Sequence, residues 1–266
     1  MRHRHWKSMA ALCGALLLAG CVQSQAVPVS QSRPAQDAPA KADLPALPIF
    51  PIANRTVVID PGHNGGGAAH ADEINAKVPD GRGGMKPCNT IGTSGDDGYT
   101  EHEFNWAVAQ LVRDQLAARG FQVIMSRDSD TGVGPCVNDR GTLGNRVGAA
   151  AVVSIHADGA PAGAHGFHVA YSSPALNDAQ SGPSVQLASR LRDTLSGAGF
   201  TPSTYVGSGG MNPRPDLAGL NFSERPTALV ECGNMRDPGD AALIESPDGR
   251  ARFARAIADA IAAYLG

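Results

Sequence analysis

The chain has 266 residues, of which 42% are hydrophobic and 18% are charged. This share of apolar residues is enough for one well-buried domain, and it excludes a chain that is disordered throughout. The formal net charge of -3 provides no basic surface, so we expect no nucleic-acid partner. No apolar stretch is long enough for a stable membrane span.

The first 20 residues have the composition of an export signal. Basic residues lie within positions 2–7, and the apolar run over 9–19 is too short to cross a bilayer. This run ends in Leu18-Ala19-Gly20-Cys21, which resembles the lipobox of bacterial lipoproteins, so Cys21 is the expected lipidation site. Cleavage after Ala26 is the alternative. We therefore expect an exported protein of the periplasm or cell envelope, held at a membrane only through such a lipid.

Residues 22–53 are rich in Pro, Ala, Gln and Ser and predict a flexible linker, which leaves 54–266 as one folded domain. Strands and helices alternate along this domain. In chain order, we predict a strand at 57–59, a helix at 104–116, a strand at 122–125, a helix at 139–149, strands at 151–155 and 166–171, a helix at 184–195, a strand at 227–230 and a helix at 253–265. The alternation predicts an α/β fold, with a twisted, mostly parallel sheet flanked by helices on both faces.

Three side chains with catalytic potential follow predicted buried strands. His63 comes after the strand at 57–59, His156 after the strand at 151–155, and Glu231 after the strand at 227–230. Functional groups gather at the carboxyl ends of the strands in such sheets. We therefore expect two imidazoles and a carboxylate at one edge of the sheet.

Two histidines and one carboxylate are a frequent ligand set of catalytic Zn²⁺, with the fourth position left for water. The third ligand should begin the helix after the first strand, where Glu101 and Glu103 compete. Thr100 and Glu103 match a capping box, which gives Glu103 a structural role and leaves Glu101 for the metal. Zinc would lower the pKa of its water to roughly 7, and Glu231 would then be the base that takes the proton.

Export also affects how the cysteines are interpreted, because disulfides form in oxidising compartments. Cys88 and Cys136 lie in loops rich in Gly and Pro, whereas Cys232 follows an apolar strand, where a thiol usually packs as a small hydrophobic group. We predict a disulfide between Cys88 and Cys136.

Six segments between about Arg55 and Gly266 form a recognisable set: Val58 to Gly66, Gly98 to Glu101 with Asn105, Ser126 to Asp128, Arg140 with Asn145, Ser154 to Asp158, and Leu229 to Asn234. Together, and in this order, they resemble the zinc-dependent N-acetylmuramoyl-L-alanine amidases of the Amidase_3 type.

The resemblance implies zinc ligands at His63, Glu101 and His156 and a catalytic carboxylate at Glu231. Its Gly98-x-x-Glu101-x-x-x-Asn105 frame favours Glu101 over Glu103. The implied substrate is the amide between N-acetylmuramic acid and L-alanine, in peptidoglycan or in muropeptides. A monomer is the simplest expectation for one compact domain.

The chain departs from the family pattern at three points. The segment between His63 and Glu101 is long and rich in glycine, and we expect it to border the cleft. Asp158 replaces an Asn that often follows the second histidine, a change that alters the charge of the site. No helix is evident that would plug the site, so we expect an enzyme that is active on its own.

Other polar residues have less specific patterns. Asp60 is expected either to orient an imidazole or to form a turn. The segment 211–220, rich in Pro and Gly, is expected to line the cleft. Loop-holding roles are predicted for Arg127, Asp128, Arg140 and Asn145, and surface or loop positions for His70, His102, His165 and His168.

Three alternatives compete with the amidase hypothesis. The same metal ligands would serve another zinc peptidase or a deacetylase of the envelope. A non-catalytic lipoprotein that binds peptidoglycan should have lost a ligand or the base, yet all four residues are present. A glycosidase using Glu101 and Glu231 as an acid pair would leave the two strand-end histidines unexplained.

Overall fold

The structure, a computed structural model, describes residues 54–266. The predicted export signal at 1–20, the lipidation site at Cys21, the alternative cleavage after Ala26 and the linker at 22–53 lie outside the described residues. Within the described part of the chain, no helix combines the length and the apolar character needed to cross a membrane.

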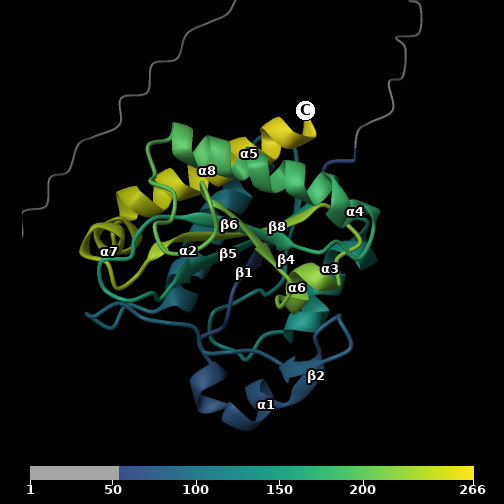
Figure 1. The fold of residues 1–266 in the computed structure, drawn as a ribbon, viewed down its shortest axis with the longest axis horizontal. Helices are drawn as coiled ribbons and strands as arrows, with labels where there is room; N and C mark the ends of the chain where they lie inside the picture. The colour runs from purple at the N-terminus through teal and green to yellow at the C-terminus, as the bar shows by residue number, and fades with distance from the viewer. Residues whose placement is uncertain (1–53) are drawn as a thin grey trace, which may run out of the picture. The chain divides into compact units, whose positions relative to one another are not determined.

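A six-stranded sheet forms the centre of the domain, with the strand order β4-β1-β5-β8-β6-β7 (Figure 1). All neighbouring strands pair in parallel except β6 and β8. The central strands β1, β5 and β8 are almost entirely buried, as expected for apolar strands covered on both faces. The strands are β1 (Thr56–Pro61), β4 (Gln122–Met125), β5 (Ala151–Asp158), β6 (His168–Ser172), β7 (Met211–Arg214) and β8 (Thr227–Asn234).

Helices cover both faces of the sheet, which confirms the predicted fold class (Figure 1). Successive residues of a strand point to opposite faces, so Val57 and Ile59 join the main core whereas Val58 joins a smaller one. The main core lies under α2 (Glu101–Ala117), α5 (Pro183–Gly197) and α8 (Pro247–Leu265). The opposite face carries α3 (Val137–Val147) and α6 (Ala218–Asn221).

The third helix is displaced from its predicted range of 139–149. The helix α3 begins two residues earlier and ends at Val147, because Gly148 adopts a left-handed conformation (φ 62°) that terminates a helix. The shorter helices α4 (Asp178–Ser181) and α7 (Pro238–Glu245) were not predicted.

The segment between β1 and α2 contains elements that the sequence did not predict. They are a 3₁₀ turn η1 (Gly67–Ala69), a helix α1 (Ala71–Asn75) and an antiparallel hairpin of β2 (Lys77–Pro79) and β3 (Met85–Pro87). The predicted disulfide is present, and it joins Cys88, at the end of this hairpin, to Cys136, the residue before α3. Cys232 is free and buried, as expected.

Candidate metal centre and active site

The loop after β1 presents His63 in an unusual backbone conformation. Among the described residues, His63 is the one non-glycine residue with a positive φ, 57°. Such a conformation costs about 1–3 kcal/mol in a non-glycine residue and persists only where the surroundings enforce it. His63 Nδ1 lies 2.8 Å from the Thr90 carbonyl oxygen. Since a carbonyl only accepts, Nδ1 carries a proton, and Nε2 is the ring atom left to bind a metal.

Two buried arginines hold the backbone of this loop. The Pro61 carbonyl accepts hydrogen bonds from Arg127 Nε at 3.0 Å and from Arg140 Nη1 at 2.8 Å. The His63 carbonyl accepts one from Arg140 Nη2 at 3.0 Å. The predicted loop-holding roles of both arginines are thus confirmed, and they fix the backbone from which the His63 ring projects.

Asp60 anchors the second of these arginines. Its carboxylate accepts hydrogen bonds from Arg140 Nη1 at 2.7 Å and from the Ser154 hydroxyl at 2.8 Å. Burial by itself would raise the pKa of Asp60, but the Arg140 charge and the Ser126 and Ser154 hydroxyls outweigh it and lower the pKa to about 2. Neither expected role of Asp60 is correct, because its partner is Arg140 and not an imidazole, and because it lies within the strand β1 and not in a turn.

The first residue of α2, Glu101, joins the two histidines. Its Oε2 lies 3.1 Å from His63 Nε2, and its Oε1 lies 2.8 Å from His156 Nδ1. The Thr93 amide donates to Oε2 at 3.0 Å and fixes the carboxylate. Burial opposes ionisation of Glu101, but the two imidazoles overcome it and lower its pKa. In turn, burial lowers the pKa of His63, but the charge and hydrogen bond of Glu101, together with the hydrogen bond to the Thr90 carbonyl, outweigh burial and raise the pKa.

The N-terminus of α2 gives Glu101 and Glu103 different roles, as predicted. The Thr100 amide donates to Glu103 Oε2 at 3.1 Å, within a complete capping box. Glu103 therefore stabilises the helix terminus, and Glu101 is free to face the histidines.

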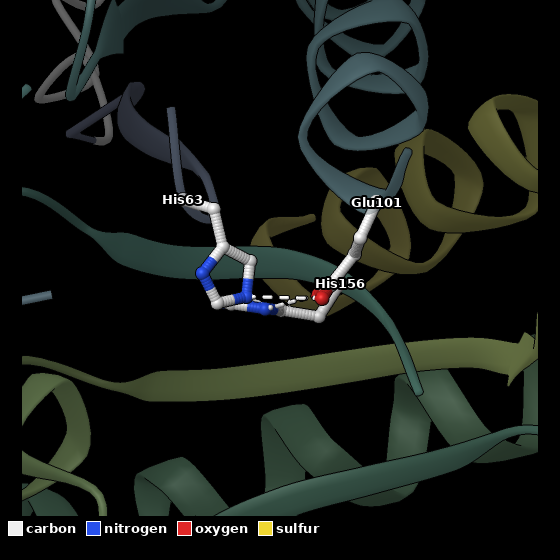
Figure 2. Close-up of side chains that lie close together, drawn as sticks. All are labelled: His63, Glu101 and His156. Carbon is white, nitrogen blue, oxygen red and sulfur yellow. Dashed lines mark hydrogen bonds and ion pairs between the residues drawn. The ribbon is translucent and has the colours of Figure 1, made fainter. Parts of the chain in front are cut away.

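The side chains of His63, Glu101 and His156 form one cluster at the carboxyl ends of β1 and β5 (Figure 2). Their ligand atoms all lie within 4.8 Å of one another. The two rings meet edge to face, with centroids 4.9 Å apart. Two imidazole nitrogens and one carboxylate that converge in this way fit the donor set of a catalytic zinc ion.

Glu231 lies on β8, in register with His156 on the neighbouring strand β5. Its Oε2 is buried and has no hydrogen-bond partner within the described residues. Burial raises the pKa of Glu231, and the nearby charges of Glu101 and Asp158 raise it further, against a lowering by Arg214. The sheet register therefore leaves a buried carboxylate oxygen beside the cluster, without a hydrogen-bond partner among the described residues.

Asp158, His168 and Tyr205 form a second polar cluster at this edge of the sheet, and the sequence predicted only the position of Asp158. Asp158 accepts hydrogen bonds from the Tyr205 hydroxyl at 3.0 Å and from His168 Nε2 at 3.4 Å. The surface position expected for His168 is wrong, because it is 2% exposed within β6. The alternation of strand residues places Asp158 on the same face as His156, so its position near the cluster could be predicted from the sequence. Nothing in the pattern around Tyr205 indicated its role.

The remaining polar predictions have mixed outcomes. Asn145 holds a loop as predicted, since its Nδ2 donates to the Phe222 carbonyl at 2.9 Å. Asp128 is exposed. His102 pairs with Asp130 at 2.7 Å and does not belong to the metal cluster.

A cavity of about 250 Å³ begins at the cluster and extends along the sheet face that carries α3 and α6. Its wall includes His63 and His156 at one end and Asn89 from the segment before α2. Both segments that were expected to border a cleft contribute to it, because residues 217–220 also lie in its wall.

An α/β fold with a His–Glu–His cluster and a free carboxylate at its strand ends defines a hydrolase-type site with a candidate metal centre. Residues 57–263 match the Amidase_3 family, described as N-acetylmuramoyl-L-alanine amidase. The chain belongs to this family, and the predicted family and enzyme class are confirmed.

Individual relatives agree with this assignment. The chain is 47% identical over 214 residues to the N-acetylmuramoyl-L-alanine amidase Rv3717 of Mycobacterium tuberculosis (strain ATCC 25618 / H37Rv), covering 80% of this chain and 88% of the relative. It also resembles the crystal structure of the N-acetylmuramyl-L-alanine amidase Ami1 from Mycobacterium smegmatis (TM-score 0.78, 52% identity, 81% of this chain and 98% of that chain). The apo form of Ami1 from Mycobacterium abscessus gives a TM-score of 0.78 at 50% identity, covering 81% of this chain and 100% of that one.

Proposed function

We propose that the protein hydrolyses the amide bond between N-acetylmuramic acid and L-alanine in peptidoglycan, with Zn²⁺ held by His63, Glu101 and His156. The observation that carries the proposal is the convergence of these three side chains beside the unpaired buried oxygen of Glu231. A bound zinc ion supplies the Lewis acid that polarises the scissile carbonyl and acidifies water.

Glu231 performs the proton transfers in this proposal. Its free Oε2 accepts the proton of the attacking water as the new C–O bond forms. Glu231 then gives this proton to the alanine nitrogen as the C–N bond breaks, which yields a lactyl carboxylate and a free peptide amine. Position in the sheet supports this role, because the register of β5 and β8 places Glu231 directly beside His156.

The ligands are held before any substrate arrives. The Thr90 carbonyl fixes the tautomer of His63, and the Thr93 amide fixes the carboxylate of Glu101. Such partners of metal ligands usually contribute 10–100-fold to metal affinity or activity. The chain therefore provides both the ligands and the groups that orient them.

We further propose that the enzyme acts outside the cytoplasm, in the cell envelope where its substrate lies. The disulfide between Cys88 and Cys136 supports this location, because such bridges persist in oxidising compartments.

Muramyl dipeptide tests the proposal, with release of a free alanine amine as the readout. We expect Glu231→Gln to lower kcat at least about 100-fold while its zinc content stays at the wild-type level. Glu224→Gln, which makes the same change at an exposed position, is the matched control and should keep full activity. Equal activity of Glu231→Gln and the wild type would exclude Glu231 as the proton carrier, and cleavage at a different bond would favour a peptidase or deacetylase.

A further inference from the structure

The cavity beside the metal centre has a mostly apolar wall and one end at the candidate zinc ligands. It lies between one face of the sheet, the end of the β2–β3 hairpin and α6. Its volume of about 250 Å³ is close to the lower end of the range for small-ligand pockets. The apolar part of the wall consists mainly of Val137, Val152, Leu217, Leu220 and Leu229.

Lys86 brings a positive charge to this wall. Its Nζ donates to the Asp216 backbone carbonyl at 2.8 Å, a neutral acceptor. The Asp216 carboxylate is already bound by Arg214 through two hydrogen bonds of 2.7 and 2.6 Å. No carboxylate of the described residues forms an ion pair with Lys86 within 4.0 Å. An ammonium group has three donors, so Lys86 retains donors for a ligand.

The other permanent cation in the wall is not available in this way. Arg140 lines the cavity, but its guanidinium is paired with Asp60 at 2.7 Å and bonded to the backbone of the His63 loop. Among the described residues, Lys86 is therefore the permanent cation of this cavity wall that forms no ion pair within 4.0 Å.

We infer that this cavity receives the stem peptide and that Lys86 binds a carboxylate of that peptide. The inference rests on the proposed function. The glycan is polar and continues on both sides of the muramic acid, so it requires an open surface. The stem peptide begins at the scissile amide, consists of small and aliphatic groups, and carries carboxylates, which fits an apolar cavity with one free ammonium group.

The short stretch of chain between Lys86 and the metal centre agrees with a contact between Lys86 and the first residues of the stem peptide. Lys86 precedes Thr90 by four residues, and the Thr90 carbonyl contacts His63. Four residues span at most about 14 Å when fully extended. Lys86 therefore lies within reach of the first few residues of a peptide whose amide is held at the metal centre.

The test compares two substrates that differ in one charge. Muramyl dipeptide carries a free carboxylate on its second residue, and an analogue with this group converted to the amide carries none. We expect Lys86→Met to raise KM for muramyl dipeptide about 10-fold or more, because hydrogen bonds to charged groups are the stronger ones. The kcat should change little, since the contact is made equally in the ground state and the transition state. Neither constant should change for the neutral analogue.

Two further variants complete the design. Lys86→Arg keeps the charge and should retain most of the preference for the carboxylate substrate. Lys77→Met makes the same substitution on the paired strand of the hairpin, at an exposed position outside the cavity wall, and should behave as the wild type.

The outcomes separate this inference from the proposed function. A wild-type enzyme that cleaves both substrates with equal KM, unaffected by Lys86→Met, would overturn the carboxylate contact and leave the amidase function intact. An equal loss on both substrates would also overturn it, because Lys86 would then act only on the structure of the hairpin. A wild-type enzyme that cleaves neither substrate would refute the proposed function itself.

Discussion

Gly62→Ala should displace the proposed zinc ligand His156 without adding or removing any charged group. A Cβ atom at Gly62 would lie 2.1 Å from His156 Cε1, 2.3 Å from Nε2 and 2.5 Å from Nδ1. Ordinary van der Waals contact begins at 3.4 Å, so the ring or the backbone must move by about 1.3 Å. Metal ligands tolerate deviations of only about 0.2 Å.

The backbone at Gly62 cannot easily provide this movement. Its amide donates to the Ile155 carbonyl at 3.0 Å, and its carbonyl accepts from Asn105 Nδ2 at 3.2 Å and Arg127 Nη2 at 3.3 Å. The His156 ring must therefore leave its position. We expect zinc affinity to fall about 100-fold or more, the upper end of the range for disturbed metal sites.

Competition with a chelator of known affinity measures this change, with thermal unfolding recorded in parallel. Gly197→Ala is the matched control, because a Cβ there meets nothing within 4 Å and its zinc affinity should equal that of the wild type. If Gly62→Ala binds zinc as tightly as the wild type, His156 is not a ligand and the site must be assigned anew.

Three further perturbations test the framework of the site. Replacing Cys88 and Cys136 by Ser should lower the free energy of unfolding by about 4 kcal/mol for a loop of 48 residues, measured by denaturant titration. Arg140→Ala should weaken zinc binding about 10–100-fold by releasing the His63 loop, with partial recovery in Arg140→Lys, measured by chelator competition. Asp60, with its pKa of about 2 against 3.8, should contribute on the order of 2 kcal/mol to stability above pH 4. This contribution should roughly halve by pH 3, so the stability difference between the wild type and Asp60→Asn should shrink as the pH falls; a constant difference would contradict the assignment.

The His63–Glu101–His156 cluster was predictable because the apolar runs of buried parallel strands show in the sequence where each strand ends. The apolar runs before His63 and His156 place both rings at one sheet edge, and the capping pattern at Thr100 distinguishes Glu101 from Glu103. Each of these inferences depends on local sequence alone, and each corresponds to the observed geometry.

The supporting groups were not predictable, because they depend on contacts distant in sequence. The shorter of the two Thr90 contacts to His63 Nδ1 is made by the backbone carbonyl, at 2.8 Å against 3.2 Å for the hydroxyl, and every residue type possesses such a carbonyl. The hairpin that carries Lys86 consists of two three-residue strands without an apolar period, and β7 contains a proline at the sheet edge. The positive φ of His63 could not be predicted either, because glycine is the residue that normally adopts this conformation and a histidine gives no sign of it.

The most direct test of the central claim is to measure zinc content and muramyl-dipeptide cleavage together, in the wild type and in His156→Ala. We predict one zinc ion per wild-type chain, products from cleavage of the bond between the lactyl group and alanine, and loss of both in the variant. A folded wild-type protein that neither binds zinc nor cleaves this bond would contradict the account.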